Sequence, residues 1–340
     1  MKKSEYPSHE VNMSPNTWND VLKEIAATQK DPQSPLDLDT VRRGKMRSVT
    51  EHTKRPLIVY AVDFLNEAKA RAAGSGIMLD WSDKEGFIEV TKGLEGEAVD
   101  ILLHSPGGLA EAADSLVDII RGQFKHVRFI VPNMAKSAAT MLALSGDQIV
   151  LDVASELGPI DPQFNFQKGD GSFVTAPAQA IIDQFEAAQK KIAKDPTILA
   201  PWLPILQQYG PALYQQAQNA IKLSKDLVKK WIMKYMLKDS SKKIRELRAR
   251  GIAKYLSDHN NFKSHAKRIG LSDIREIKAL KSINVVDMRE DPELQNRVWG
   301  LYHAISLTFD YTAAYKIFEN TGGMALIRML QTVQVAGPIK

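Results

Sequence analysis

Four short runs of β-branched and other large apolar residues, separated by patterns typical of helices, constrain the fold of this chain more than any other feature. The runs are residues 57–62, 99–103, 127–131 and 148–151. The helical patterns are residues 64–73, 109–122 and 138–144. Apolar runs with helices between them are typical of a parallel sheet that is buried on both faces and joined by right-handed crossovers. We therefore predict an α/β fold of mostly parallel strands.

The predicted strands lie in one part of the 340-residue chain, which indicates three segments. Residues 1–55 are polar and contain one amphipathic helical pattern, residues 16–30, so we expect an N-terminal arm with one helix. Residues 56–175 hold the predicted α/β core. No strand pattern follows Asp161, and we predict that residues 176–340 form a helical C-terminal region.

The chain has no cysteine, which excludes disulfide bonds and thiolate catalysis and suits a reducing compartment. Two lysines stand near the N-terminus, but no apolar run of roughly 7–15 residues follows them, as a secretory signal needs. No stretch reaches the roughly 18 uncharged apolar residues that span a bilayer. We therefore expect a cytoplasmic protein without a membrane span.

The positive charge of the chain is concentrated in one segment. Residues 222–254 contain twelve Lys and Arg residues against three acidic residues, whereas the whole chain has a net charge of +5. This distribution excludes a uniformly basic nucleic-acid binder. The segment is either the solvated charged face of helices or a contact for an anionic partner, such as an acidic peptide, a nucleic acid or an anionic lipid.

A double-glycine turn follows the second predicted strand, in the sequence Ser105-Pro106-Gly107-Gly108. Glycines after a strand let the backbone turn sharply and leave N–H groups near a helix N-terminus, where they can bind an anion or a developing oxyanion. The alternative is a purely structural strand-to-helix turn. His104, just before the turn, is interpreted as a packing residue at the end of the strand.

A serine flanked by small residues follows the third predicted strand, in the sequence Met134-Ala135-Lys136-Ser137-Ala138. At a strand-to-helix junction, the helix N-terminus can stabilise negative charge at the serine hydroxyl, which suits a nucleophile. The alternative is that Ser137 caps the helix. Gly108 and Ser137 are 29 residues apart, about one βα unit, so both turns should meet at the same edge of adjacent strands, where ligands bind in such sheets.

These two motifs, together with the sequence Ser155-Glu156-Leu157-Gly158-Pro159-Ile160-Asp161-Pro162-Gln163, resemble the serine dehydrogenase proteinase family of the Clp-protease/crotonase superfamily. This family is distantly related to signal peptide peptidase A and the Clp proteolytic subunit. The segment Phe262-Lys263-Ser264-His265 is similar to the family's aromatic-x-Thr-His segment. The resemblance implies a Clp/crotonase-like core, a serine peptidase that acts on peptides or proteins, and assembly as a homo-oligomer.

The resemblance also implies a catalytic triad, with Ser137 as nucleophile, Asp161 as orienting acid and His265 as general base. The oxyanion hole would consist of the amide of Gly107 or Gly108 and that of Ala138. A triad is defined by geometry rather than chain order, so the order Ser, Asp, His is compatible with it.

Several alternatives remain open for the supporting residues. Asp161 could serve only its Asp-Pro turn, and His259 is an alternative base. A Ser–Lys dyad is the rival mechanism, with Lys190, Lys191 or Lys194 as candidates.

Other functional classes also remain open. These are an acyl-CoA enzyme on the same fold and a non-catalytic scaffold that binds protein or nucleic acid. The sequence has no HExxH, Walker or dinucleotide-binding motif, and we expect neither a metal nor another cofactor.

Overall fold

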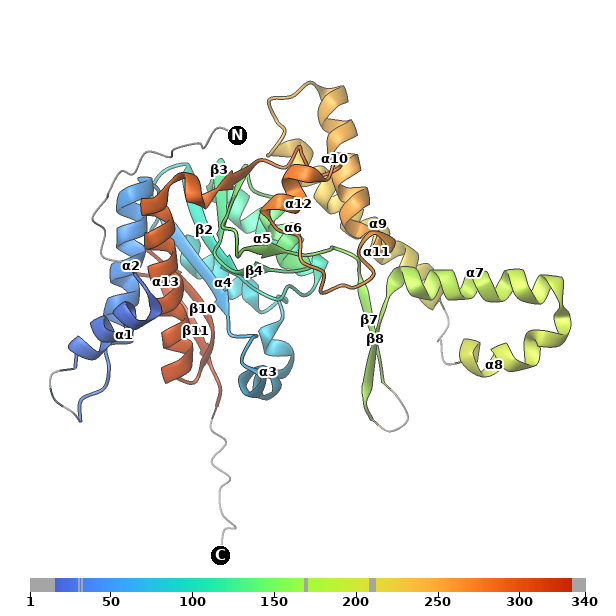
Figure 1. Cartoon of the computed structure of the whole chain (residues 1–340), viewed down its shortest axis with the longest axis horizontal. Helices are drawn as coiled ribbons and strands as arrows, with labels where there is room; N and C mark the ends of the chain where they lie inside the picture. The colour runs from blue at the N-terminus through green and yellow to red at the C-terminus, as the bar shows by residue number, and fades with distance from the viewer. Residues whose placement is uncertain (1–15, 30, 32, 168–170, 208–211, 332–340) are drawn as a thin grey trace, which may run out of the picture.

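A seven-stranded sheet forms the centre of the computed structural model, which describes residues 16–29, 31, 33–167, 171–207 and 212–331 (Figure 1). Its strand order is β11-β10-β1-β2-β3-β5-β9. The strands are β1 (Leu57–Val62), β2 (Ala98–His104), β3 (His126–Val131), β5 (Gln148–Leu151), β9 (Val285–Asp287), β10 (Ala314–Asn320) and β11 (Ala325–Met329). The five strands from β1 to β9 are parallel, and β10 and β11 form an antiparallel hairpin at one edge.

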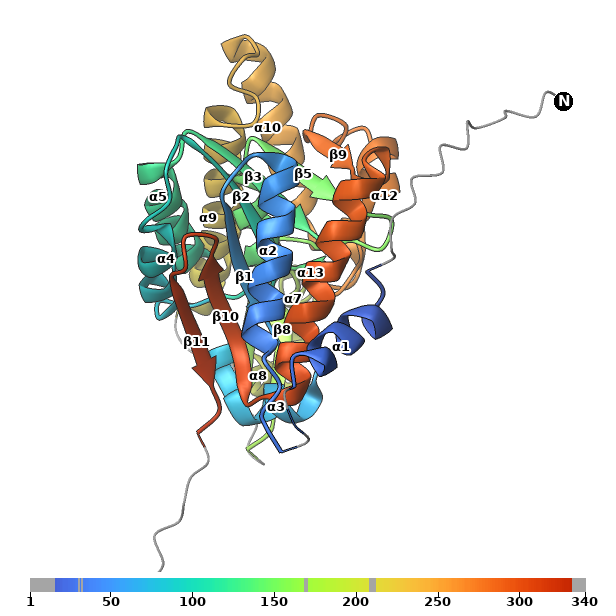
Figure 2. The ribbon, with the colours of Figure 1, turned by 90° about the vertical axis from the view of Figure 1, so that its left-hand side faces the viewer.

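Both faces of this sheet are buried, because successive side chains of each strand enter different apolar cores. In β1, Ile58 and Tyr60 belong to one core and Leu57 and Val59 to the other. The first core is completed by α4 (Asp83–Thr91), α5 (Ala110–Gln123), α6 (Ala138–Leu144), α9 (Leu213–Lys234), α10 (Lys242–Ser257) and α12 (Leu271–Glu276). On the opposite face, α2 (Leu38–Thr53) and α13 (Pro292–Tyr311) lie side by side (Figure 2).

The remaining elements are small or lie at the margins of this core. Two-residue strands β4 (Met134–Ala135) and β6 (Glu156–Leu157) pair beside the main sheet. Four short or peripheral helices are α1 (Trp18–Ala27), α3 (Glu67–Ala73), α8 (Leu199–Gln207) and α11 (His259–Phe262). The hairpin of β7 (Gln163–Gln167) and β8 (Phe173–Pro177) extends from the α/β body together with α7 (Ala178–Lys194) and α8 (Figure 1).

The predicted fold class is confirmed: the four apolar runs are β1, β2, β3 and β5, which are parallel neighbours. The expectation that strands end at Asp161 is wrong, because β7 to β11 follow it, and β9, β10 and β11 join the main sheet. Residues 176–340 are therefore not purely helical. The division of the chain after residues 55 and 175 stays a prediction.

The expected single helix of the N-terminal segment corresponds to α1, but a second helix, α2, follows it. Residues 1–15 of that segment lie outside the described part of the chain. α2 was not predicted because its sequence is rich in charged residues. One of these, Arg42, is nevertheless fully buried, where it forms an ion pair with Glu319 of β10. None of the helices in the described ranges combines the length and the apolar character that a bilayer crossing requires.

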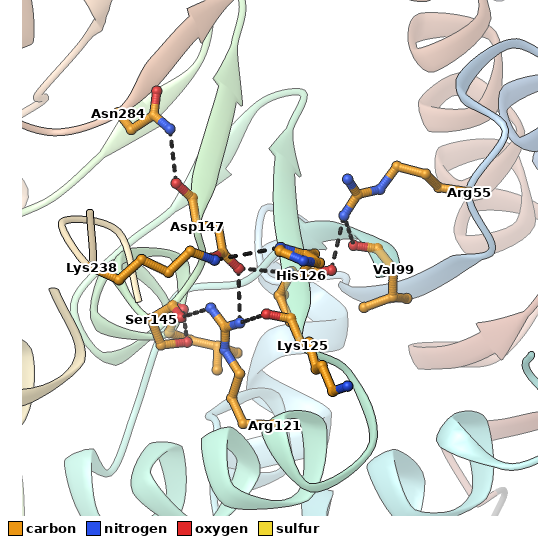
Figure 3. Close-up of polar contacts among 11 residues, drawn as sticks. Arg55, Val99, Arg121, Lys125, His126, Ser145, Asp147, Lys238 and Asn284 are labelled. Atoms are coloured by element: carbon orange, nitrogen blue, oxygen red, sulfur yellow. Dashed lines mark hydrogen bonds and ion pairs between the residues drawn. The ribbon is translucent and has the colours of Figure 1, made fainter. Parts of the chain in front are cut away.

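A polar cluster closes the amino edge of the parallel strands, opposite the turns that follow β2 and β3 (Figure 3). Asp147, just before β5, accepts hydrogen bonds from Arg121 and from the backbone amide of Val127, both at 2.8 Å, and from Lys238 at 2.7 Å. Burial alone would raise the pKa of the Asp147 carboxyl, but these hydrogen bonds hold it below its ordinary value of 3.8. The carboxylate thus joins α5, β3 and the chain after α9.

We expect Asp147→Asn to lower the free energy of unfolding by about 2–3 kcal/mol, because the nearly buried Arg121 loses its charged partner. The wild-type contribution is present above the unfolded pKa and is lost as the pH falls through the lower folded pKa. Urea unfolding of wild type and variant across the acid range tests both points. Glu97→Gln, which removes an exposed ion pair with Lys125, is the control and should change stability by less than about 1 kcal/mol. Equal losses in the two variants would contradict the expectation.

Candidate active site

The two turns singled out in the sequence meet at the carboxyl edge of neighbouring strands. β2 and β3 pair in parallel, so the chain after His104 and the chain after Val131 leave the sheet together. The amide of Ser105 donates to the carbonyl of Met134, and the amide of Lys136 donates to the carbonyl of Ser105, each at 3.0 Å. These two hydrogen bonds hold the turns in register. The predicted juxtaposition is therefore confirmed.

Gly107 leaves no room for a side chain between the two turns. Its φ of +85° is in the left-handed region. A Cβ at this position would lie 2.3 Å from the carbonyl oxygen of Lys136 and 2.9 Å from Cβ of Ser137. A side chain here would therefore push the double-glycine turn away from the serine.

Ser137 has a strained backbone at the start of α6. Its φ of 50° and ψ of −121° lie in a region that costs a non-glycine residue about 1–3 kcal/mol. It occupies the N-cap position, but its hydroxyl makes no capping hydrogen bond. The capping alternative therefore does not account for this serine. Such strain is typical of a nucleophile held on a sharp strand-to-helix turn.

Within the described part of the chain, the backbone amides of Gly108, Ser137 and Ala138 have no acceptor. Gly107, by contrast, donates its amide hydrogen to the Ser105 hydroxyl at 3.2 Å.

The double-glycine turn also pairs with Leu79, whose amide donates to the Gly107 carbonyl and whose carbonyl accepts from the Leu109 amide, both at 2.8 Å. Because N–H directions alternate along extended backbone, the Gly108 amide points away from Leu79. Of the two glycines considered for an oxyanion hole, Gly108 has the free donor.

Asp161 brings both candidate histidines together. Its carboxylate is buried and accepts from Nδ1 of His265 at 2.7 Å on one oxygen and from Nδ1 of His259 at 2.8 Å on the other. Gln163 also donates to it at 2.8 Å. Since a carboxylate only accepts, each imidazole carries its proton on Nδ1, which leaves Nε2 as a proton acceptor.

A cavity of about 980 Å³ connects these groups. Its wall includes Ser137, His265 and the free-amide residues Gly108 and Ala138, whereas His259 does not line it. Its apolar lining includes Met141, Ile160 and Leu223. No hydrogen bond links Ser137 to His265 in the described structure, and catalytic contacts of this kind often tighten only when substrate binds.

The candidate lysines lie elsewhere. Lys190 and Lys191 are on α7, outside the cavity wall; Lys190 is largely exposed beside Glu186, and Lys191 lies 5.6 Å from the ring of Trp202. Lys136 adjoins the serine in sequence, but its ammonium donates to Glu156 at 2.6 Å. The structure thus brings a histidine, and none of these lysines, to the cavity that Ser137 lines.

His104 has the structural role expected for it. It packs between Phe64 and Tyr302, with ring centroids 4.9 and 5.2 Å away. Burial lowers its pKa to about 4, so the imidazole is neutral at neutral pH.

Sequence reasoning missed several residues of the site. Leu79 pairs with the double-glycine turn, and Met78 together with Leu223 and Ser224 of α9 lines the cavity. Only their contacts across the fold mark them, because no local motif surrounds them. Within the described ranges, no group of three or more His, Cys, Asp or Glu side chains is arranged to hold a metal ion.

The family model of the ClpP-like SDH-type serine proteinases matches residues 79–293, which include the double-glycine turn, Ser137, Asp161 and His265. The chain belongs to this family. Its resemblance to the serine dehydrogenase proteinases is thereby confirmed.

Two uncharacterized proteins of Methanocaldococcus jannaschii are similar to part of the chain. Uncharacterized protein MJ0137 is 32% identical over 123 residues, which are 36% of this chain and 38% of that protein. Uncharacterized protein MJ1495 is 29% identical over 105 residues, which are 31% of this chain and 33% of that protein. The matches thus span only about a third of the length of these relatives.

Two solved structures of the 1510-N membrane-bound stomatin-specific protease are also similar. A serine-to-alanine mutant gives a TM-score of 0.35 at 18% identity over 63% of this chain and 77% of that chain. A lysine-to-alanine mutant in complex with a substrate peptide gives a TM-score of 0.26 at 28% identity over 32% of this chain and 52% of that chain.

We expect Gly107→Ala to lower the free energy of unfolding by about 2 kcal/mol or more, because the added Cβ overlaps the Lys136 carbonyl and the backbone is left-handed. Thermal unfolding measures the loss. Gly122→Ala, on α5 with open space around the added Cβ, is the control and should be neutral or stabilising by up to about 1 kcal/mol. A Gly107→Ala protein as stable as wild type would show that the two turns do not meet as described.

Proposed function

We propose that this chain is a serine peptidase that cleaves peptide bonds through an acyl-enzyme formed on Ser137. One observation carries the proposal: a strained serine whose hydroxyl caps no helix shares a cavity with His265, whose imidazole is held by Asp161. Membership of a serine proteinase family supports it independently.

In the proposed mechanism the Ser137 hydroxyl attacks the peptide carbonyl carbon while Nε2 of His265 takes the hydroxyl proton. Asp161 accepts from Nδ1 throughout and stabilises the imidazolium. The amides of Gly108 and Ala138 donate to the oxyanion, and each such donor is worth roughly 3–4 kcal/mol by mutational precedent.

The intermediate collapses as His265 gives its proton to the leaving amine, which breaks the C–N bond and leaves an ester on Ser137. Water then attacks this ester with His265 again as base, and His265 returns the proton to the Ser137 oxygen as the ester bond breaks and the acid product leaves.

Two rival enzymes have less support from the geometry. A Ser–Lys dyad needs a lysine at the nucleophile, but Lys190 and Lys191 lie outside the cavity wall. An acyl-CoA enzyme would use the free amides without a serine nucleophile and gives no reason for the strain at Ser137. Self-association and a cytoplasmic location stay predictions.

We expect a fluorophosphonate probe to label the wild-type protein at Ser137 and to leave Ser137→Ala unlabelled. His265→Ala should slow labelling by at least about 10³-fold, because the serine loses its base. His259→Ala should slow it by no more than about tenfold, because this residue contacts Asp161 but does not line the cavity. Lys190→Ala is the control and should match wild type.

Labelling of Ser137→Ala at the wild-type rate would exclude Ser137 as nucleophile. A larger loss of labelling rate in His259→Ala than in His265→Ala would identify His259 as the base. A slower labelling rate in Lys190→Ala would favour the Ser–Lys dyad. Release of new N-termini from a denatured protein substrate, absent in Ser137→Ala, would identify the reaction as peptide hydrolysis.

An anionic partner of the basic segment, residues 222–254, is a second proposal. α10 presents exposed Ile244 and Leu247 among exposed lysine and arginine side chains, a surface that suits an acidic partner with apolar groups. The α10 surface includes none of the residues that line the cavity.

We expect binding to heparin, used as a model polyanion, to weaken as salt rises and to survive Ser137→Ala. A double variant, Arg248→Glu with Arg250→Glu, should lose this binding, whereas Lys190→Glu with Lys191→Glu, on α7, should keep it. Equal losses in the two double variants would point to net charge rather than to this segment.

A further inference from the structure

A buried ion pair lies directly behind one wall of the cavity. The ammonium of Lys316, on β10, donates to the carboxylate of Asp83, on α4, at 2.7 Å, and both side chains are 0% exposed. The same ammonium donates to the carbonyl of Met78 at 2.9 Å. Met78 lines the cavity, so this pair is attached to the cavity wall by its backbone.

The other oxygen of the Asp83 carboxylate contacts residues on the side of the double-glycine turn. The Tyr60 hydroxyl, on β1, donates to it at 2.7 Å. The Ser105 hydroxyl accepts from the Gly107 amide at 3.2 Å, and its nearness to Tyr60 acts to lower the pKa of that phenol. Tyr60 and Ser105 are also 0% exposed.

These groups lie in a row between the double-glycine turn and the buried ion pair. The Gly107 amide donates to Ser105, Ser105 adjoins Tyr60, and the Tyr60 hydroxyl donates to Asp83. Burial and the neighbouring Asp83 raise the pKa of Tyr60 well above its ordinary value, so the phenol stays protonated and remains a donor. We name Lys316, Asp83, Tyr60 and Ser105 the buried relay.

Both ends of the buried relay hold backbone that surrounds the free Gly108 amide. One end fixes Met78 and the other fixes Gly107, and Leu79 pairs with the turn between them. An additional Cβ at Gly108 would lie 2.1 Å from the Leu79 carbonyl oxygen, so the two segments are packed without spare room. A shift at either end would therefore rotate or displace the Gly108 amide.

We propose that the buried relay consists of positioning residues that aim the Gly108 amide at the oxyanion. This inference rests on the proposed peptidase function. The relay does not touch substrate, and its effect is on the rate of the acylation step rather than on binding. Folding stability alone is a poor reason for such a relay, because a buried ion pair often contributes no more to the free energy of unfolding than apolar residues of the same volume.

The chain contains a matched control on the same strand. Glu319 of β10 accepts from Arg42 of α2 at 2.6 Å, and both side chains are 0% exposed. This second pair faces α2 on the opposite side of β10 and contacts no residue of the cavity wall. Disrupting it should affect stability without affecting the site.

The test is saturation kinetics of fluorophosphonate labelling for Tyr60→Phe, Ser105→Ala and the double variant, beside Glu319→Gln. We expect each relay variant to lower the maximal labelling rate by about 10- to 100-fold, with a half-saturating concentration within about twofold of wild type. The double variant should lose little more than one single variant. Glu319→Gln should lower the melting temperature and keep the wild-type rate.

The outcomes separate the two ideas. If the wild-type protein is not labelled at Ser137, the proposed function fails and the relay loses its role with it. If labelling occurs but Tyr60→Phe and Ser105→Ala, folded by circular dichroism, keep the rate of Glu319→Gln, only the relay is excluded. A rise in half-saturating concentration at unchanged maximal rate would also overturn it, because the relay would then act on binding.

Discussion

The contact between Gly107 and the backbone around Ser137 is the constraint on which the rest of the site depends. A Cβ at this position would overlap the Lys136 carbonyl. The turns after β2 and β3 can therefore come this close only because residue 107 has no side chain. The approach places the free amide of Gly108 beside the serine. It also explains how two adjacent crossover turns, each ordinary by itself, make one chemically distinctive cleft.

Several buried charges of the described structure are held by partners from a distant part of the chain. Asp161 is held by two imidazoles from the chain after α10, Lys316 by Asp83, and Glu319 by Arg42. Unpaired, each of these groups would cost several kcal/mol inside the protein. The C-terminal part of the chain therefore completes the electrostatics of a core whose strands come mainly from its first half.

The success and failure of sequence reasoning have the same origin. The strands β1, β2, β3 and β5 were predictable because both of their faces are apolar. A strand of this kind is stable only when it is buried on both sides. β10 was not predictable, because Lys316 and Glu319 interrupt its apolar run and read as solvent-exposed. The same holds for α2, where Arg42 occupies a fully buried position.

The sequence by itself determined the parallel core, the meeting of the two turns and the presence of a serine at the head of α6. These follow from local pattern, because alternation along a strand and the length of a βα unit restrict where the next strand can lie. Only the tertiary structure decided that His265, rather than His259 or a lysine, lines the cavity, and that Gly108 rather than Gly107 keeps a free amide. Those outcomes depend on contacts between residues up to 104 positions apart, whose geometry no local pattern encodes.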